Sequence, residues 1–164
     1  MAGSGSSRNP DADRPSTLRS RSDDKSTGIH YHVLIVEDDE SDVFLIQEAL
    51  RAMQLSVTLH VATDGERATR FFDVVDNDPA EPCPALVILD INLPKKQGGA
   101  VLEHMRQSRR CAHASVIAIS TSASVRDRER MASLGADQYF RKPSEYDEFM
   151  KLGDIARALL EVPR

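Results

Sequence analysis

Apolar residues gather in short runs along this chain, and several runs end directly at a polar or acidic residue. Uninterrupted apolar stretches at residues 33–36, 85–89 and 116–119 are typical of strands that are buried on both faces. Shorter or partly alternating stretches predict two more strands at residues 57–62 and 136–141. The chain is therefore expected to contain five strands.

Segments with apolar residues at helical spacing separate these strands. The predicted helices lie around residues 43–53, 64–75, 101–108, 125–134 and 149–160. Ser41 or Asp39 is expected to cap the first helix, and Ser144 the last. This alternation predicts an α/β protein with helices on both faces of a parallel sheet. Because crossovers are right-handed, the natural topology is a doubly wound five-stranded parallel sheet of order 2-1-3-4-5.

The N-terminal segment differs from the rest of the chain. Residues 1–28 are rich in Ser, Gly, Pro, Asp and Arg, and Leu18 is their only large apolar residue. Such a segment cannot bury enough apolar surface to fold, so it is predicted to be a disordered tail. Residues 29–164 are then expected to form one domain, with no output domain.

Composition and charge exclude several classes of function. The net charge is −5, of which residues 1–28 carry +1 and the remainder −6. An acidic domain without a helix-turn-helix pattern argues against direct binding to nucleic acid. No apolar run approaches the roughly 20 residues that span a bilayer, and no secretory signal is visible. The protein is expected to be cytoplasmic and free of the membrane, with Cys83 and Cys111 as ordinary thiols.

Acidic residues follow two strands that the predicted sheet makes neighbours. Glu37 and Asp38 follow the first strand, and Asp90 ends the third. Parallel strands end at the same edge of a sheet, which is where ligands bind in open α/β folds. Three carboxylates this close repel one another unless a cation neutralises them, and hard oxygen ligands suit Mg²⁺. An acidic run can also be a solvated turn, but a second strand that delivers an acid to the same place favours a metal site.

Two further polar residues end strands at the same edge. Ser120 ends the fourth strand and Lys142 follows the fifth. The Lys142 ammonium can pair with Asp90 or with a phosphoryl oxygen, and the Ser120 hydroxyl can turn toward a new anion. Each residue taken alone is usually a loop residue. Together with the acids, they predict a carboxylate nucleophile served by metal ligands, a hydroxyl and a cation.

With these residues the chain closely resembles the receiver domain of two-component response regulators. The resemblance runs from about His32 to Leu160. Its motifs are VLIVEDD at 33–39, LVILDINLPKKQGG at 86–99, VIAIST at 116–121 and GADQYFRKPS at 135–144. The resemblance implies the flavodoxin-like receiver fold for residues 29–164 and the function of a stand-alone response regulator.

The resemblance also implies where phosphorylation and metal binding occur. Asp90 would be the phosphoacceptor, and Glu37 with Asp38 would be the acid pair that serves Mg²⁺ beside it. Asn92 would give its backbone carbonyl to the metal. Position after the first strand indicates Asp38, and not Asp39, as the principal ligand of the pair.

A switch is implied on the neighbouring strands. Ser120 would be the switch hydroxyl, and Tyr139 the aromatic residue that changes rotamer with it. Lys142 would be the phosphate-binding lysine, and the Lys142–Pro143 bond would be cis. On this reading the protein is not an enzyme with a separate substrate. It is a phosphoacceptor that catalyses its own phosphotransfer and dephosphorylation.

The implied phosphodonor is a histidine kinase or a phosphotransfer protein. The IQEAL helix, the LPKK and STS runs and the KPS motif resemble phytochrome-associated regulators, which predicts a light-sensing kinase as donor. A homodimer is part of the same expectation. Phe44 is apolar on an otherwise polar helix face beside the acidic edge. It is predicted to dock the phosphohistidine domain, although it can equally be a scattered surface hydrophobe.

Three other readings stay open at this point. A flavin mononucleotide binder has similar strand order, but the acids that follow its first strand here would repel a phosphate. A haloacid-dehalogenase-type phosphatase also uses a strand-end Asp, but it would usually have a second Asp where Asn92 stands. A phosphorylation-independent pseudo-receiver typically lacks the acceptor, the acid pair or the lysine, and all three are present in this sequence.

Overall fold

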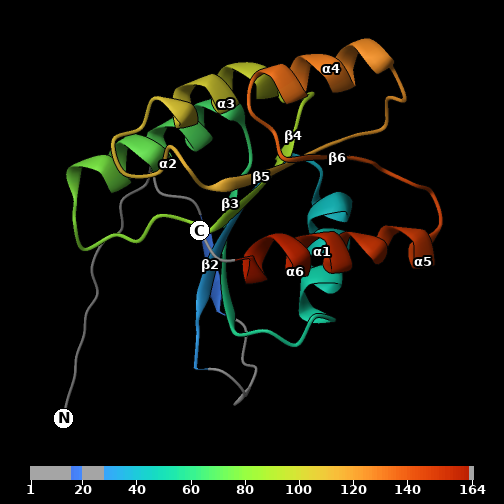
Figure 1. The fold of residues 1–164 in the computed structure, drawn as a ribbon, viewed down its shortest axis with the longest axis horizontal. Helices are drawn as coiled ribbons and strands as arrows, with labels where there is room; N and C mark the ends of the chain where they lie inside the picture. Colours follow the sequence, from blue (N-terminus) through green and yellow to red (C-terminus); the bar gives the residue numbers. More distant parts are fainter. Residues whose placement is uncertain (1–15, 20–27, 163–164) are drawn as a thin grey trace.

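The strands form one sheet in the computed structural model, which describes residues 16–19 and 28–162. The order is β1-β3-β2-β4-β5-β6 (Figure 1). The strands are β1 (Ser16–Arg19), β2 (Tyr31–Val36), β3 (Val57–Ala62), β4 (Leu86–Asp90), β5 (Ser115–Ser120) and β6 (Gln138–Arg141). The last five strands are all parallel to one another. The predicted doubly wound sheet of order 2-1-3-4-5 is therefore confirmed.

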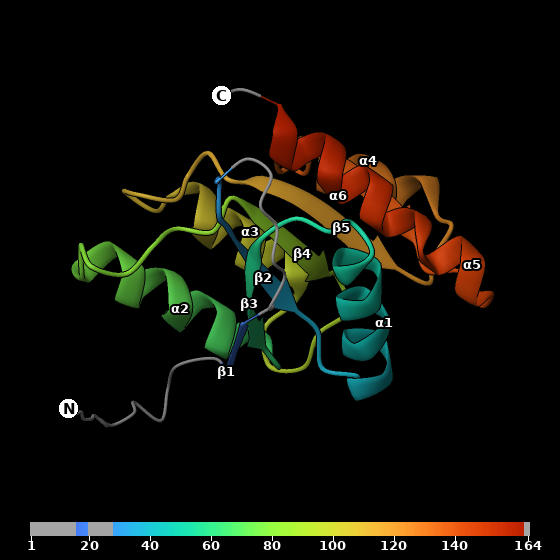
Figure 2. The same ribbon diagram turned by 90° about the horizontal axis from the view of Figure 1, so that it is seen from below.

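Helices cover both faces of this sheet. They are α1 (Glu40–Arg51), α2 (Gly65–Asn77), α3 (Gly98–Arg106), α4 (Val125–Ser133), α5 (Tyr146–Phe149) and α6 (Lys151–Glu161). Helices α1, α5 and α6 lie on one face, and α2, α3 and α4 lie on the other (Figures 1 and 2). None of the described helices is both long enough and apolar enough to cross a bilayer.

The central strands are buried on both faces, as their apolar runs predict. In β2, Val33 and Ile35 pack toward α1 and α6, whereas Leu34 and Val36 pack toward α2 and α3. Alternating side chains of one strand thus supply two separate apolar cores. Gly153 lets α6 approach α1 closely, because a Cβ there would collide with the backbone oxygen of Ala49.

The cap predictions hold at α1 but not at the C-terminal helices. Asp39 caps α1, and its side chain accepts hydrogen bonds from the backbone N–H groups of Ser41 and Asp42. Ser144 does not cap the last helical segment. That segment begins at Tyr146, and Glu145 at the cap position makes no side-chain cap bond. It is also divided by Met150 into α5 and α6.

Strand β1 was not expected. It pairs antiparallel with β3 at the edge of the sheet, with Ser16 opposite Val61 and Arg19 opposite Thr58 (Figure 2). It falls within the segment predicted to be a disordered tail. Backbone pairing with an open sheet edge needs no apolar run, so the composition did not reveal it. The rest of the tail prediction lies outside the described residues, apart from Gly28.

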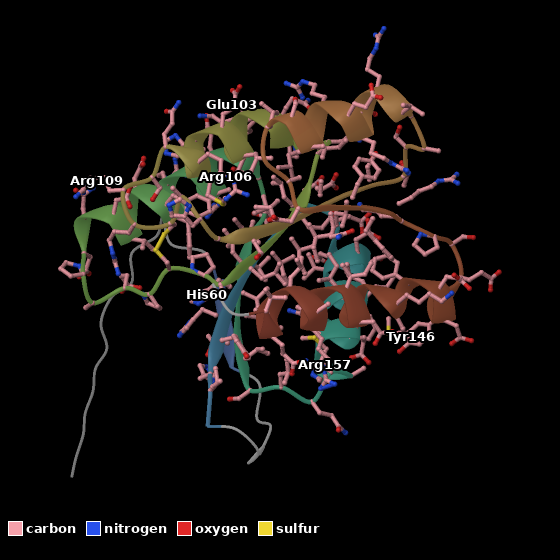
Figure 3. All side chains as sticks on the ribbon, viewed as in Figure 1. His60, Glu103, Arg106, Arg109, Tyr146 and Arg157 are labelled. Carbon is pink, nitrogen blue, oxygen red and sulfur yellow. A yellow bond between two sulfur atoms is a disulfide. The ribbon has the colours of Figure 1, made fainter. Side chains whose placement is uncertain are left out.

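Two finer expectations are wrong. The Lys142–Pro143 bond is trans, as are all peptide bonds of the described residues, and trans is the favoured isomer even before proline. Cys83 and Cys111 are not thiols but form a disulfide, with their Cα atoms 5.5 Å apart (Figure 3). The fold brings the loop before β4 to the loop after α3, which the spacing of the two cysteines along the chain does not show.

Candidate functional site

Three carboxylates meet at the carboxyl edge of the sheet. Strands β2 and β4 are parallel neighbours with Val36 opposite Leu89, so Glu37 and Asp90 emerge side by side. Carboxylate oxygens of Glu37, Asp38 and Asp90 all lie within 4.8 Å of one another. Glu37 and Asp90 are buried, whereas Asp38 is exposed. The structure thus brings together the acids that the sequence predicted at this edge.

Lys142 joins this cluster from the end of β6. Its Nζ lies 2.9 Å from Oε1 of Glu37, and it donates a hydrogen bond of 3.0 Å to Oδ2 of Asp90. A backbone hydrogen bond of 2.7 Å from Lys142 to the oxygen of Ser120 fixes the start of the loop. The side chain of Lys142 is 9% exposed, so its charge acts at short range with little solvent screening.

Burial and charge shift the pKa values of two groups. Burial raises the pKa of Glu37 to about 8, an effect that Lys142 opposes and the Asp90 charge reinforces. Burial disfavours the Lys142 ammonium, but hydrogen bonds with Asp42 and Glu37 and the charge of Asp90 outweigh it and raise the pKa of Lys142. The lysine is therefore cationic at neutral pH, and burial favours the protonated form of Glu37 when no metal is bound.

The donor set fits a hard divalent cation. Oε1 of Glu37 is buried and accepts no hydrogen bond, although it lies close to the Lys142 ammonium. A buried carboxylate oxygen needs a nearby positive charge, which the Lys142 ammonium supplies here and which a dication shared with two further carboxylates would supply more strongly. Mg²⁺ takes one or two carboxylates and completes its shell with water, for which exposed Asp38 leaves room. The side chain of Asp39 is not in this group, because it caps α1.

Ser120 and Asn92 lie next to Asp90. The backbone N–H of Asn92 donates a hydrogen bond of 2.8 Å to Oδ1 of Asp90. The Asn92 amide nitrogen lies 3.4 Å from the hydroxyl oxygen of Ser120, which also accepts a hydrogen bond of 3.0 Å from the N–H of Ser122. Asn92 thus links Asp90 to the predicted switch hydroxyl. That the Asn92 carbonyl ligates a metal stays a prediction.

Tyr139 is tied to the same loop. Its hydroxyl donates a hydrogen bond of 3.0 Å to the backbone oxygen of Ser122, and its ring is half-buried. The guanidinium of Arg128, from α4, lies 5.2 Å from the ring centroid, within cation–π distance. Ser122 therefore contacts both Ser120 and Tyr139, so the loop after β5 connects the two predicted switch residues.

Sequence reasoning missed one residue of the site. Asp42, in the first turn of α1, accepts a hydrogen bond of 2.8 Å from Lys142. The other site residues can be recognised because they lie at the ends of predicted strands, whereas Asp42 lies inside a helix. The available signal was a further acid one helical turn beyond the N-cap, on a helix that starts at the acidic edge.

Gly98 allows the loop after Asp90 to fold back on the site. A Cβ at Gly98 would lie 2.5 Å from Cα of Ile91 and 2.6 Å from the backbone oxygen of Asp90. Gly98→Ala is expected to lower the free energy of unfolding by about 2 kcal/mol, because rigid backbone must move. Gly99→Ala is the matched control, since a Cβ there meets only the flexible guanidinium of Arg130. Equal urea midpoints for the two variants would contradict this explanation.

Similar proteins include regulators associated with phytochromes. Response regulator Rcp1 of Synechocystis sp. is 30% identical over 120 residues, which are 73% of this chain and 82% of Rcp1. A crystal structure of the Mn²⁺-bound form of Rcp1 superposes with a TM-score of 0.72 at 29% identity, covering 82% of this chain and 97% of that one. The structure of the phosphorylated cyanobacterial phytochrome response regulator RcpA also gives 0.72, at 27% identity, covering 83% of this chain and 98% of that one.

A family model matches most of the described chain. The model that describes the response regulator receiver domain matches residues 33–153, which include the three acids, the serine and the lysine of the site. The chain therefore belongs to the response regulator receiver domain family.

Proposed function

We propose that this protein accepts a phosphoryl group on Asp90 from a histidine kinase or phosphotransfer protein, with Mg²⁺ bound at Glu37, Asp38 and Asp90. The observation that carries the proposal is the Asp90 carboxylate, buried at the sheet edge and paired with Lys142 inside a cluster of acids. A carboxylate so placed can act as a nucleophile, while the cations offset the charge of the incoming group.

Phosphotransfer follows from the contacts of Asp90. An oxygen of its carboxylate attacks the phosphorus of a phosphohistidine, so that an O–P bond forms, the P–N bond breaks and the imidazole leaves. The N–H of Asn92 and the ammonium of Lys142 hold the carboxylate, and Lys142 can then pair with a phosphoryl oxygen. Bound Mg²⁺ would supply further charge stabilisation for the transferring group.

The output of phosphorylation is proposed to pass through Ser120 and Tyr139. Phosphorylation adds a charge of roughly −1.5 to −2 beside the Ser120 hydroxyl. If Ser120 turns toward the new anion, the loop at Ser122 moves and the hydrogen bond that holds Tyr139 changes. The face formed by α4, β6 and the C-terminal helices α5 and α6 would then present a different surface to a partner.

The identity of the donor and the setting belong to the same proposal. Similarity to phytochrome-associated regulators supports a light-sensing histidine kinase as donor. A cytoplasmic location and a homodimer remain predictions, as does the absence of any activity on a separate substrate. The phosphatase reading gains no support, since Asn92 donates to Asp90 and contacts Ser120 where that reading needs an acid.

The test is transfer of labelled phosphate from a phosphorylated histidine kinase in the presence of Mg²⁺. The label is expected to be released by hydroxylamine, because an aspartyl phosphate is an acyl phosphate. Phosphoramidate, a small donor with the same P–N bond, serves as a second donor that needs no kinase docking. The proposal is overturned if neither donor labels the protein or if the label resists hydroxylamine.

Magnesium binding is expected to tighten as the pH rises. Because the pKa of Glu37 is about 8 without metal, binding at pH 7 must displace its proton. The dissociation constant should fall about ten-fold between pH 7 and pH 9 and level off above that. In metal-free protein, the pKa of Glu37 is about 8 in the folded state and 4.5 in the unfolded chain. The folded state therefore binds this proton more tightly, and the free energy of unfolding falls as the pH rises from about 4.5 toward 8. Calorimetry in buffers of different ionisation enthalpy measures the proton release.

Glu37→Gln is the control for that experiment. The variant should bind Mg²⁺ more weakly, but with an affinity that changes little over the same pH range. A wild-type affinity that does not change between pH 7 and pH 9 would show that Glu37 is already ionised.

Phe44 is expected to contribute to kinase docking. It is 56% exposed on α1 and lines a cavity of about 180 Å³ together with Val43 and the site residues Glu37 and Asp38. Phe44→Ala is expected to slow phosphotransfer from the kinase about ten-fold, as for an apolar interface anchor. Labelling by phosphoramidate should not change. Val162→Ala, at another exposed apolar residue beyond α6, is the control, and equal kinase rates for both variants would make Phe44 a scattered hydrophobe.

A further inference from the structure

The Lys142 ammonium is surrounded by three carboxylates. Its Nζ donates hydrogen bonds to Asp42 at 2.8 Å and to Asp90 at 3.0 Å, and it lies 2.9 Å from Oε1 of Glu37. An ammonium has three N–H donors, of which two are used by Asp42 and Asp90, and the contact with Glu37 is an ion pair. The shortest of the three contacts is made by Asp42, which the proposed phosphotransfer mechanism does not use.

The three carboxylates differ in what else they do. Glu37 and Asp90 belong to the acidic group that can hold a metal ion, whereas Asp42 does not. A bound dication would therefore compete with Lys142 for Glu37 and Asp90, and it would repel the ammonium at short range. Asp42 is the one partner, among the three, that Lys142 could keep.

Asp42 is well placed to keep it. Asp42 lies in the first turn of α1, and its backbone N–H donates a hydrogen bond of 3.1 Å to the capping carboxylate of Asp39. Its side chain is 24% exposed, whereas that of Glu37 is 1% exposed, so Asp42 contacts Lys142 from the solvent side of the cluster. The contact spans 100 residues and connects α1 to the end of β6.

We propose that Asp42 is a positioning residue: it retains the Lys142 ammonium beside the acceptor when Mg²⁺ takes over Glu37 and Asp90. The inference rests on the proposed function, since it takes those two acids as metal ligands. Without Asp42, the Lys142 ammonium has only the carboxylates of Glu37 and Asp90 as partners, and it competes more strongly with the metal ion for them. The negative charge of Asp42 on α1 would thus allow the Lys142 ammonium, which follows β6, and a metal ion to occupy the same small site.

A double-mutant cycle on metal binding tests this. The dissociation constant for Mg²⁺, and for Mn²⁺ by electron paramagnetic resonance, is measured for wild type, Asp42→Asn, Lys142→Met and the double variant. Asp42→Asn is expected to weaken binding about five-fold, and Lys142→Met to tighten it, because a competitor is removed. In the Lys142→Met background, Asp42→Asn should change the constant less than about two-fold.

Two controls separate positioning from simple charge. Glu40→Gln removes an exposed acid from the same turn of α1 and should change the constant less than about two-fold. Asp42→Glu keeps the charge and should restore most of the affinity if the longer side chain still reaches Lys142. Equal effects of Asp42→Asn in both backgrounds would overturn the proposal and reduce Asp42 to a long-range charge.

The outcomes also separate this inference from the proposed function. Binding is measured without phosphorylation, so a positive cycle stands even if no donor labels the protein. Normal binding by wild type with no coupling between Asp42 and Lys142 defeats only the positioning role. Failure of wild type to bind either metal at millimolar concentration defeats both the positioning role and the metal site.

Discussion

Asp90→Asn is expected to abolish labelling by the phosphorylated kinase and by phosphoramidate, to below about 1% of the wild-type level, because an amide is not a nucleophile at neutral pH. Asparagine has the size of aspartate and retains an oxygen. It can therefore still accept the hydrogen bond from the N–H of Asn92, now 2.8 Å long, or the one from Lys142 at 3.0 Å. The loss should thus be chemical, with little change in the fold.

Asp64→Asn is the matched control for the acceptor. Asp64 is another buried acid near the carboxyl edge of the sheet, but it caps α2 and accepts a hydrogen bond of 2.8 Å from the N–H of Arg67. Asn is as good an N-cap residue as Asp, so this replacement should leave both the labelling and the free energy of unfolding nearly unchanged. If Asp90→Asn is labelled as fully as wild type, the phosphoryl group resides on another residue, and the roles given to Lys142 and Ser120 fall with it.

The part of the site that follows strands could be predicted from the sequence alone. Apolar runs identify strands, and in a parallel sheet every strand ends at the same edge. Knowing that Glu37, Asp90, Ser120 and Lys142 each end a strand was therefore enough to bring them together. The handedness of the crossovers then made the strands that carry Glu37 and Asp90 neighbours.

Other parts could not be predicted, because they depend on distances that no local pattern encodes. Asp42 meets Lys142 only once α1 and the end of β6 are placed in three dimensions. The side-chain contact of Asn92 with Ser120 depends on the course of a loop, which periodicity does not describe. Strand β1 forms by backbone pairing with β3, and the sequence of residues 16–19 does not predict this pairing.

Removing the Cys83–Cys111 disulfide is expected to lower the free energy of unfolding by about 3 to 4 kcal/mol. The bridge closes a segment with a sequence separation of 28 residues, and its loss frees the unfolded chain more than it changes the folded one. Urea unfolding of wild type with and without a phosphine reductant measures the effect. The Cys83→Ser/Cys111→Ser variant should match the reduced protein and should not respond to reductant.

The folded structure around the disulfide has other supports, so the site should survive reduction. The Arg110 guanidinium donates hydrogen bonds to the backbone oxygens of Val75, Asp78 and Glu81, which hold the end of α2 and the loop before β4. Labelling of Asp90 and the Mg²⁺ affinity are therefore expected to be unchanged in reduced protein. Two thiols that react in native protein before reductant is added would show that the bridge is absent in solution. A reducing cytosol keeps most thiols free, so the same thiol count on protein taken from cells also tests whether the bridge forms there.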